Sequence, residues 1–422
     1  MPLVSVSPAS ARAVPRFAAL HVAGYRRYFL LGLLAMTADN IEHVISYWVI
    51  YLKFHSPALA GFAVISHWVP FLLFSVLAGA LADRYDCRKL IQVGQALFMI
   101  ASAAWGLLFL TDTLRVWHAV VILLLHGAAG VIIAPASQLI VHDMVGPAQL
   151  SSAIRLNATG RYLAILLGPG IGGGMMLLLG PAWGLLANVL LYLPFTFFLA
   201  LTPYTGHSRH PDRARRPLRF GAGETFALFT TARADRRLLS MILLGAATSL
   251  FVGSAFQAQM PEYAHSLGAT DAKVWYSVLL AGNAAGAVLG AVLLETAELL
   301  RPSARAAIVC AGVWAMTLVL FPLTTSYAVA LLLLVIGGAF NIAFTSMAQT
   351  IVQLRAQAEV RGRMVGLFNT AMLGLRAGSG LSVGLLGAVI GVHWSLMLSA
   401  MVVVLIAVWL YTRERRYREG PA

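Results

Sequence analysis

Two acids and a histidine lie close together in the first long apolar segment of the chain, within AMTADNIEHVISYW. Asp39 is 11 residues beyond Tyr28, which places it about 16 Å along a helix and near the middle of a bilayer. Glu42 and His43 follow at i+3 and i+4, so the three side chains share one helix face. An acid at the membrane centre costs about 2.5–3.5 kcal/mol. These groups are therefore expected to face a wet cavity or charged partners.

Arginines in two other apolar segments are candidate partners. Arg376, in AMLGLRAGSG, lies 12 residues beyond Met364 and again near mid-membrane. Two roles are open for it, an ion pair with Asp39 or Glu42 and the binding of an anionic substrate. Arg161 starts another segment, where it either snorkels to the inner interface or joins the same site.

The charges of this set suggest a proton-coupled mechanism. Two acids and two arginines make the fully ionised set neutral. Protonation of Asp39 or Glu42 would leave Arg376 free to attract an anionic group, and deprotonation would recapture it. Proton and substrate would then compete, as antiport requires. The same acids with His43 also offer the oxygen and nitrogen ligands of a divalent metal ion, so a metal exporter is an alternative.

The elements that must position these residues are membrane-spanning helices. The chain has 422 residues, 59% hydrophobic and 11% charged, whereas soluble domains average about 25% charged residues. Repeated apolar runs of about 18 residues or more predict bilayer-spanning helices and exclude a soluble enzyme, a secreted disulfide scaffold and a nucleic-acid-binding domain. The expected helices are 28–51, 58–82, 89–111, 116–138, 156–180, 182–203, 238–260, 272–296, 304–322, 327–350, 364–391 and 393–412.

The predicted fold is an all-α membrane protein with twelve transmembrane helices in two pseudo-symmetric six-helix bundles around a central cavity. One long polar linker separates two halves of near-equal length, which suggests duplicated bundles. The expected parts are a cytoplasmic lead-in at 1–27, the N-terminal bundle at 28–203, the basic cytoplasmic linker at 204–237, the C-terminal bundle at 238–412 and a cytoplasmic tail at 413–422.

The basic residues indicate the orientation of the chain. Of 30 Lys and Arg residues, 24 fall in alternate loops and the two tails. This is the positive-inside pattern, which predicts that both termini are cytoplasmic. The net charge of +14 thus reflects membrane topology, and no nucleic-acid partner is expected.

The loop after the second segment reads GALADRYDCRK. An acid at a helix C-terminus needs cations or another helix's N-terminus nearby, and a glycine one turn earlier permits that approach. The stretch resembles the G-x-x-x-D-R-x-G-x-R-K signature of the major facilitator superfamily. The matching residues are Gly79, Asp83, Arg84, Arg88 and Lys89. The resemblance implies a charge latch against the other half that favours the outward-facing state. Asp86 replaces the family's glycine, and Asp tolerates a left-handed turn.

A second match lies in AILLGPGIGGG. Gly168, Pro169, Gly172 and Gly173 resemble the superfamily's G-P-x-x-G-G element, which is associated with proton-exchanging exporters. Its physical content is helix packing, because small residues permit backbone contact and proline bends a helix.

Further stretches look like the branch that holds enterobactin-type siderophore exporters and macrolide efflux proteins: FAALHVAGYRRYF, QMPEYAHSLGA and VRGRMVGLFNTAMLG. Many drug exporters place a coupling arginine four residues before a glycine in the fourth helix. Here Leu123 holds that position, and His126 is the titratable group in the helix core. In this fold the seventh and tenth helices line the cavity, so Gln257 and Asn341 join the expected proton- or substrate-binding residues.

The sequence therefore predicts a secondary transporter of the bacterial inner membrane, not an enzyme. We expect a monomeric, proton-coupled exporter of a small and possibly anionic organic molecule such as a siderophore or drug, working by alternating access. The alternatives are a divalent metal exporter and a proton-coupled importer of an organic anion. The proton gradient is the expected energy source, with no cofactor and no resident metal.

Overall fold

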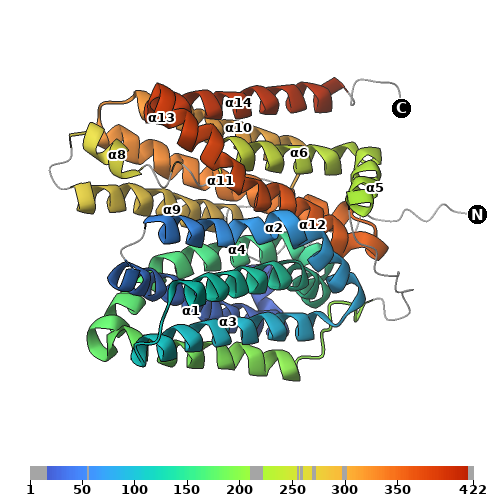
Figure 1. The fold of residues 1–422 in the computed structure, drawn as a ribbon. Coiled ribbons are helices and arrows are strands. Elements are labelled where there is room, and N and C mark those ends of the chain that lie inside the picture. Colours follow the sequence, from blue (N-terminus) through green and yellow to red (C-terminus); the bar gives the residue numbers. More distant parts are fainter. Residues whose placement is uncertain are drawn as a thin grey trace, which may run out of the picture.

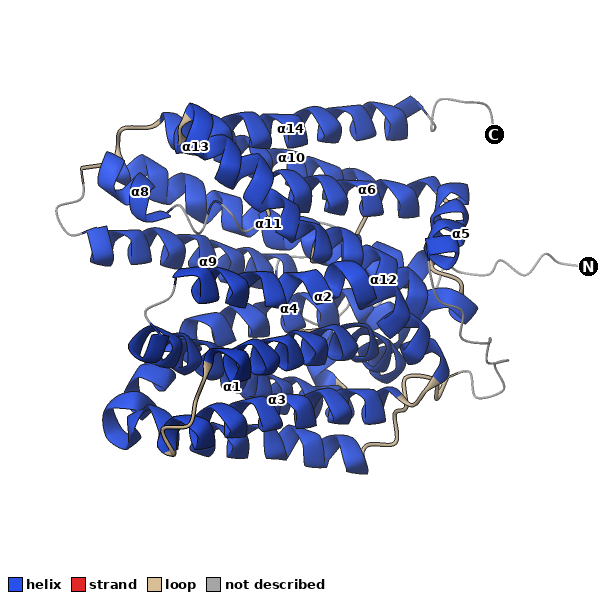
Figure 2. Cartoon of the chain, viewed as in Figure 1, coloured by secondary structure: helices blue, strands red, loops and turns tan. Residues whose placement is uncertain are grey.

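The structure of the protein is a computed structural model that describes residues 17–54, 57–209, 222–253, 256, 260–268, 272–296 and 302–416. Helices make up nearly all of these residues, and no strand occurs among them (Figure 2). Gln257 and part of the predicted linker, 210–221, lie outside the described residues.

The first half of the chain forms six passes. Its helices are η1 (Ala18–His21), α1 (Ala23–Phe54), α2 (Pro57–Arg84), α3 (Cys87–Leu110) and α4 (Val116–Leu201). The 86-residue α4 is interrupted at Gly146 (φ 70°) and Gly180 (φ 78°). A proline follows each of these glycines. Since glycine adopts positive φ and proline lacks an N–H, each Gly-Pro pair ends one pass and begins the next.

The second half of the chain is less regular. Its helices are α5 (Ala222–Ala234), α6 (Arg236–Phe251), α8 (Met260–Ser266), α9 (Ala272–Thr296), α10 (Ala304–Leu320), η2 (Phe321–Leu323), α11 (Tyr327–Arg355), η3 (Ala358–Val360), α12 (Arg361–Met372), η4 (Gly374–Gly378), the π-helical η5 (Gly380–Leu385), α13 (Leu386–Ile390) and α14 (Val392–Arg416).

Two of the predicted continuous helices in this half are wrong. The segment predicted at 238–260 leaves α-helical structure after Phe251, and Gly253 has φ 50°. The segment predicted at 364–391 changes from α-helix to 3₁₀-helix and then π-helix before α13. Apolar runs predict the length of a pass, but they do not show where its hydrogen-bond pattern changes.

The predicted all-α membrane fold is confirmed. Among the described residues, seven helices are long and apolar enough to cross a bilayer, and α4, one of the seven, contains three passes. Figure 1 shows the blue-to-green first half beside the yellow-to-red second half, with α2 and α12 where the two meet. Apolar side chains remain exposed on the outside, Leu177 and Leu178 at 88% and 86%, as a lipid-facing surface requires.

The turn between α2 and α3 differs from the expectation. Asp86 has φ −59° and caps the N-terminus of α3, where its carboxylate accepts from the backbone N–H of Arg88. The predicted left-handed turn at this residue is therefore wrong. An acid at an N-cap satisfies one of the free N–H groups at the start of a helix, which a glycine in a left-handed turn cannot do.

Candidate functional site: an acid–histidine cluster and a closed gate

Small residues hold α1 close against the middle pass of α4. A Cβ at Gly168 would lie 2.4 Å from the Cβ of Asn40, and one at Gly172 would lie 3.5 Å from the Cα of Ile41. The amide of Asn188 also donates to the carbonyl oxygen of Ala38 (3.0 Å). This packing fixes the rotation of α1 around Asp39. Gly173 has no such neighbour, and the backbone around Pro169 stays helical.

A second close approach aligns α2 with the first pass of α4. A Cβ at Gly127 would lie 2.1 Å from the carbonyl oxygen of Ser66, so only glycine fits there. His126 and His67 are the adjacent residues, and their rings come within 6.0 Å of each other, measured between centroids.

His126 bridges the two acids of α1. Its Nδ1 lies 2.9 Å from Oε1 of Glu42, and its Nε2 lies 3.1 Å from Oδ1 of Asp39. The ring also packs against Phe98 of α3 at 4.6 Å. One imidazole therefore holds two carboxylates in a fixed arrangement, with little freedom to rotate between them.

The cluster is buried, and its hydrogen bonding is incomplete. The side chains of Glu42 and His126 are 2% and 8% exposed, whereas that of Asp39 is 28% exposed. Oε2 of Glu42 and Nδ1 of His67 have no hydrogen-bond partner among the described residues. Unsatisfied polar atoms are costly in a low-dielectric interior, so this arrangement is poised to take up a proton, a water molecule or a ligand.

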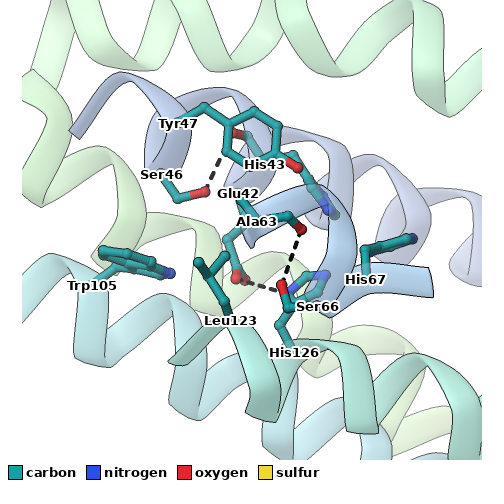
Figure 3. A pocket seen from close by; sticks show the side chains of 10 residues that line it. All are labelled: Glu42, His43, Ser46, Tyr47, Ala63, Ser66, His67, Trp105, Leu123 and His126. Atoms are coloured by element: carbon teal, nitrogen blue, oxygen red, sulfur yellow. Dashed lines mark hydrogen bonds and ion pairs between the residues drawn. The ribbon is translucent and has the colours of Figure 1, made fainter. Parts of the chain in front are cut away.

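His43 completes this group, which we call the acid–histidine cluster: Asp39, Glu42, His43, His67 and His126. His43 Nδ1 donates to the carbonyl oxygen of Asp39 (2.8 Å), and its ring centre is 4.6 Å from that of His126. A pocket with room for about one water molecule opens beside the cluster (Figure 3). Its walls include Ser66 of α2 and Trp105 of α3.

The three imidazoles are close enough to share a metal ion. One ring nitrogen from each of His43, His67 and His126 lies within 4.8 Å of the other two. Imidazole nitrogen suits zinc, copper, iron and nickel. To act as a ligand, however, His126 would have to give up one of its two carboxylate partners.

The other predicted site residues that the structure describes form no ion pair or hydrogen bond with this cluster. Among the described residues, Asp39 and Glu42 form ion pairs with histidines, not with Arg376. The guanidinium of Arg376 lies 4.9 Å from the ring centre of Trp68, and that of Arg161 lies 6.0 Å from the ring of Tyr162.

Asn341 is half-buried on α11. Its carbonyl oxygen accepts a hydrogen bond from Thr345 of the same helix (2.9 Å).

The end of α2 contacts the start of α12 directly. Asp83 accepts hydrogen bonds from the backbone N–H groups of Gly362 (2.6 Å) and Arg363 (2.9 Å). A Cβ at Gly79 would lie 2.1 Å from the carbonyl oxygen of Gly362, and one at Gly366 would lie 2.3 Å from that of Ser75. An acid thus meets the positive end of a helix dipole across a seam made of backbone.

The basic neighbours of Asp83 do not contact the other half in this way. Arg88 pairs with Asp86 (2.7 Å) and donates to the carbonyl oxygen of Thr202 (2.6 Å). Arg84 lies over the ring of Tyr85, and Lys89 is exposed. Of the predicted latch residues, Asp83 and Gly79 are the ones that contact the other half among the described residues.

A related contact joins α9 to α4. Glu295, near the C-terminus of α9, pairs with Arg155 at 2.6 Å and accepts a hydrogen bond from Ser152. Glu295 occupies the second pass of its half, as Asp83 does in the first half. Together the Asp83 and Glu295 contacts hold the halves shut at the end where the basic loops gather, and we call them the gate.

The sequence pattern predicts the acids of the cluster but not that His67 and His126 lie beside them. His67 and His126 were visible as titratable residues in apolar segments, and each stands beside a residue at a helix–helix contact. The pairing of Glu295 with Arg155 joins positions 140 residues apart and leaves no local pattern in the sequence.

The chain matches a known protein family over nearly its whole length. Residues 14–419 match the family described as "Transmembrane secretion effector". The chain belongs to this family of major facilitator superfamily transporters. It is accordingly a multi-pass membrane transporter of small molecules, not an enzyme, as predicted.

A curated relative is the staphyloferrin A transporter of Staphylococcus aureus strain NCTC 8325 / PS 47. It is 23% identical over 190 residues, which are 45% of this chain and 48% of the relative. The match thus spans about half the length of that transporter.

Solved structures of other transporters are similar over nearly the whole chain. The human organic anion transporter MFSD10 (TETRAN) aligns with a TM-score of 0.70 at 16% identity, covering 92% of this chain and 99% of its own. A bacterial homologue of the iron transporter ferroportin, outward-facing with soaked iron, gives 0.67 at 15% identity and covers 94% and 99%. A variant of the E. coli fucose:proton symporter gives 0.71 at 12% identity and covers 94% and 99%. At these identities the likeness concerns the fold alone.

Proposed function

We propose that the protein is a proton-coupled antiporter that exports a small organic molecule, such as a siderophore or drug, across a bacterial inner membrane. It would work as a monomer by alternating access, with both termini in the cytoplasm. The description of its family as a secretion effector and the partial similarity to a staphyloferrin A transporter support export and this class of cargo. The positive-inside pattern supports the orientation.

The bridge of His126 between Asp39 and Glu42 carries the proposal. With one protonated imidazole between two carboxylates, the three groups have a net charge of −1, and one further proton makes them neutral. A buried charge is expensive inside a membrane protein. A proton entering this site therefore relieves a cost that the closed protein carries, and its release restores the cost. This is the physical requirement for coupling proton binding to a change of conformation.

Several titratable groups surround the site. From α1 they are Asp39, Glu42, His43 and Tyr47, from α2 His67, and from α4 His126 and Tyr192.

The gate supplies the other part of alternating access. With Asp83 and Glu295 engaged, the protein is closed at the end of the basic loops, which is the cytoplasmic end in the proposed orientation. Cargo would leave from the opposite side in this state. Proton uptake there would then neutralise the buried cluster, so that the protein can pass through the occluded state and return to the inward-open state.

The proposal is tested in phosphatidylcholine vesicles that contain the purified protein and a pH-sensitive dye, with staphyloferrin A and a panel of drugs as cargo. Asp39→Asn should fold and insert normally but reduce cargo-driven proton flux to background, because it removes a proton acceptor. The matched control is Asp112→Asn, which alters an exposed acid paired with Lys53 outside the cluster and should transport normally. Unchanged flux in Asp39→Asn would contradict proton coupling at this site.

A second candidate cargo, a divalent metal ion, is favoured by the three imidazoles within 4.8 Å of one another. The double engagement of His126 with carboxylates favours the proton instead. Zn²⁺ or Mn²⁺ added to the same vesicles separates the two. Saturable metal flux that is lost in His67→Ala would establish metal transport. The direction of movement in vesicles of known orientation distinguishes export from uptake.

A further inference from the structure

Two transmembrane passes of the second half are interrupted next to each other. The regular part of α6 ends at Phe251, and α12 ends at Met372. A Cβ at Gly253 would lie 2.4 Å from Oγ of Ser379, and one at Gly378 would lie 2.4 Å from a methyl group of Leu250. The two interruptions therefore pack directly against each other.

Serine hydroxyls satisfy the carbonyl groups that these breaks release. Ser249 donates to the carbonyl oxygen of Met372 (2.5 Å). Ser382 donates to those of Leu250 (2.8 Å) and Phe251 (3.0 Å). Irregular backbone at membrane depth is tolerated only where it is buried in protein or lines a water-filled cavity. Broken helices of this kind form the substrate sites of many transporters.

Arg376 lies on the 3₁₀ segment of this break and reaches the other half of the molecule. Its Nε donates to the carbonyl oxygen of Met372 (3.2 Å), and its guanidinium carbon is 4.9 Å from the ring centre of Trp68 on α2. A Cβ at Gly374 would lie 2.5 Å from the Cα of Leu72, so the break is seated directly on α2. The Arg376–Trp68 pair thus spans the interface between the halves.

Among the described residues, the guanidinium of Arg376 has no carboxylate partner. Its side chain forms no ion pair with the described residues, and its Nε bonds to a backbone carbonyl oxygen. Its two terminal amino groups have no hydrogen-bond partner among the same residues. A cation at the bilayer centre costs about 2.5–3.5 kcal/mol on insertion scales, and it normally marks a substrate or ion pathway. A ligand that brings an anion would supply the missing counter-charge.

The geometry also selects the kind of anion. The guanidinium carbon of Arg376 lies over the ring of Trp68, and its terminal N–H groups have no hydrogen-bond partner among the described residues. Two parallel N–H groups match the two oxygens of a carboxylate, a pairing that lysine cannot reproduce. We propose that Arg376, seated on Trp68, is a substrate subsite that binds one carboxylate of an organic anion edge-on. This inference rests on the proposed function, because it names the class of the cargo.

The test uses the full chain in nanodiscs of phosphatidylcholine, so that no anionic lipid competes. Binding of acetate, succinate and citrate is measured by calorimetry, with trimethyl citrate as the neutral counterpart and inorganic phosphate as an anion of different shape. The wild type should bind citrate and not its ester. Arg376→Lys should weaken citrate binding by about 10- to 100-fold, as expected for the loss of a charge-assisted bidentate pair.

Two further variants separate recognition from folding. Trp68→Phe keeps an aromatic face and should weaken binding by less than about fivefold, because a phenyl ring retains much of the cation–π attraction. Arg413→Lys changes another arginine–indole pair, 5.6 Å from Trp409 at the end of α14, and should leave binding unchanged. Wild type that binds no carboxylate, or Arg376→Lys that binds citrate as well as wild type, overturns the proposal.

Asp39→Asn separates this inference from the proposed function. If that variant loses proton-coupled flux but still binds citrate, both stand as separate sites. If carboxylate binding ignores Arg376 while Asp39→Asn still abolishes flux, only the subsite fails. If citrate binding depends on Arg376 while Asp39→Asn transports normally, proton coupling fails and the subsite stands.

Discussion

The protein buries carboxylates in two regions and satisfies them differently. At the gate, both oxygens of Asp83 accept backbone N–H groups, and both oxygens of Glu295 accept from Arg155 or Ser152. In the acid–histidine cluster, Oε2 of Glu42 has no hydrogen-bond partner among the described residues. Full satisfaction favours the ionised form of an acid, whereas incomplete satisfaction leaves room for a proton. In the proposed mechanism, the same chemical group therefore joins the two halves in one region and accepts a proton in the other.

The largest effect is expected from the removal of His126, the imidazole that bridges the two acids. His126→Ala would leave the buried Glu42 without its partner and Asp39 with only the longer contact to His43, and we expect a loss of about 3–5 kcal/mol of stability at neutral pH. Stability should recover as the pH falls, because protonation removes the charges that lost their partner. Thermal unfolding in detergent between pH 5 and pH 8 measures this. Equal losses at every pH would show that His126 acts only through packing.

The next largest effect is expected at the gate. Glu295→Gln removes the charge from a pair that closes the gate, and it should shift the equilibrium towards the open state by about 1.5–3 kcal/mol. The shift can be followed as the distance between spin labels at Val93→Cys and Leu354→Cys, two exposed positions on opposite halves. The native Cys87 and Cys310 are buried and can be replaced beforehand. A distance distribution that matches the parent protein would contradict a role in closure.

A smaller effect is expected at the other gate contact. Asp83→Asn keeps one acceptor for the N-terminus of α12 but loses the charge, so the same label pair should report a shift of about 1–2 kcal/mol. Arg84→Gln is the matched control. Its guanidinium lies over Tyr85 on its own half, so its effect should stay within about 0.5 kcal/mol. A larger shift for Arg84→Gln than for Asp83→Asn would instead support the expectation from the sequence that the basic residues form the latch.

The sequence predicted the half of the cluster that depends on local spacing. Asp39, Glu42 and His43 share a face at i, i+3 and i+4, and the cost of burying acids in lipid indicated that this face points inward. It could not show that His126 bridges Asp39 and Glu42, because this contact depends on how α1 and α4 are rotated against each other. Gly168, which sets this rotation, and Gly127, which aligns α2 with α4, indicate close contacts in the sequence but do not identify the partner helices.

The backbone breaks show a similar limit. Gly146 and Gly180 each precede a proline and each interrupt α4, yet Gly168 also precedes a proline and the helix continues. The difference lies in the surroundings, since Gly168 is pressed against α1 by Asn40. The breaks near Phe251 and Met372 depend on hydroxyls from Ser249 and Ser382, which are ordinary residues in an apolar run.

The seam between α2 and α12 has a consequence for the speed of opening. Gly79, Gly362 and Gly366 bring bare backbone together, so parting the helices requires no side chain to change its rotamer. Water must enter instead, because it has to hydrate the carbonyl oxygens that become exposed when the helices separate. Solutes excluded from protein surfaces, such as sucrose, oppose that hydration. We therefore expect osmotic pressure to act directly on the proposed opening of the gate.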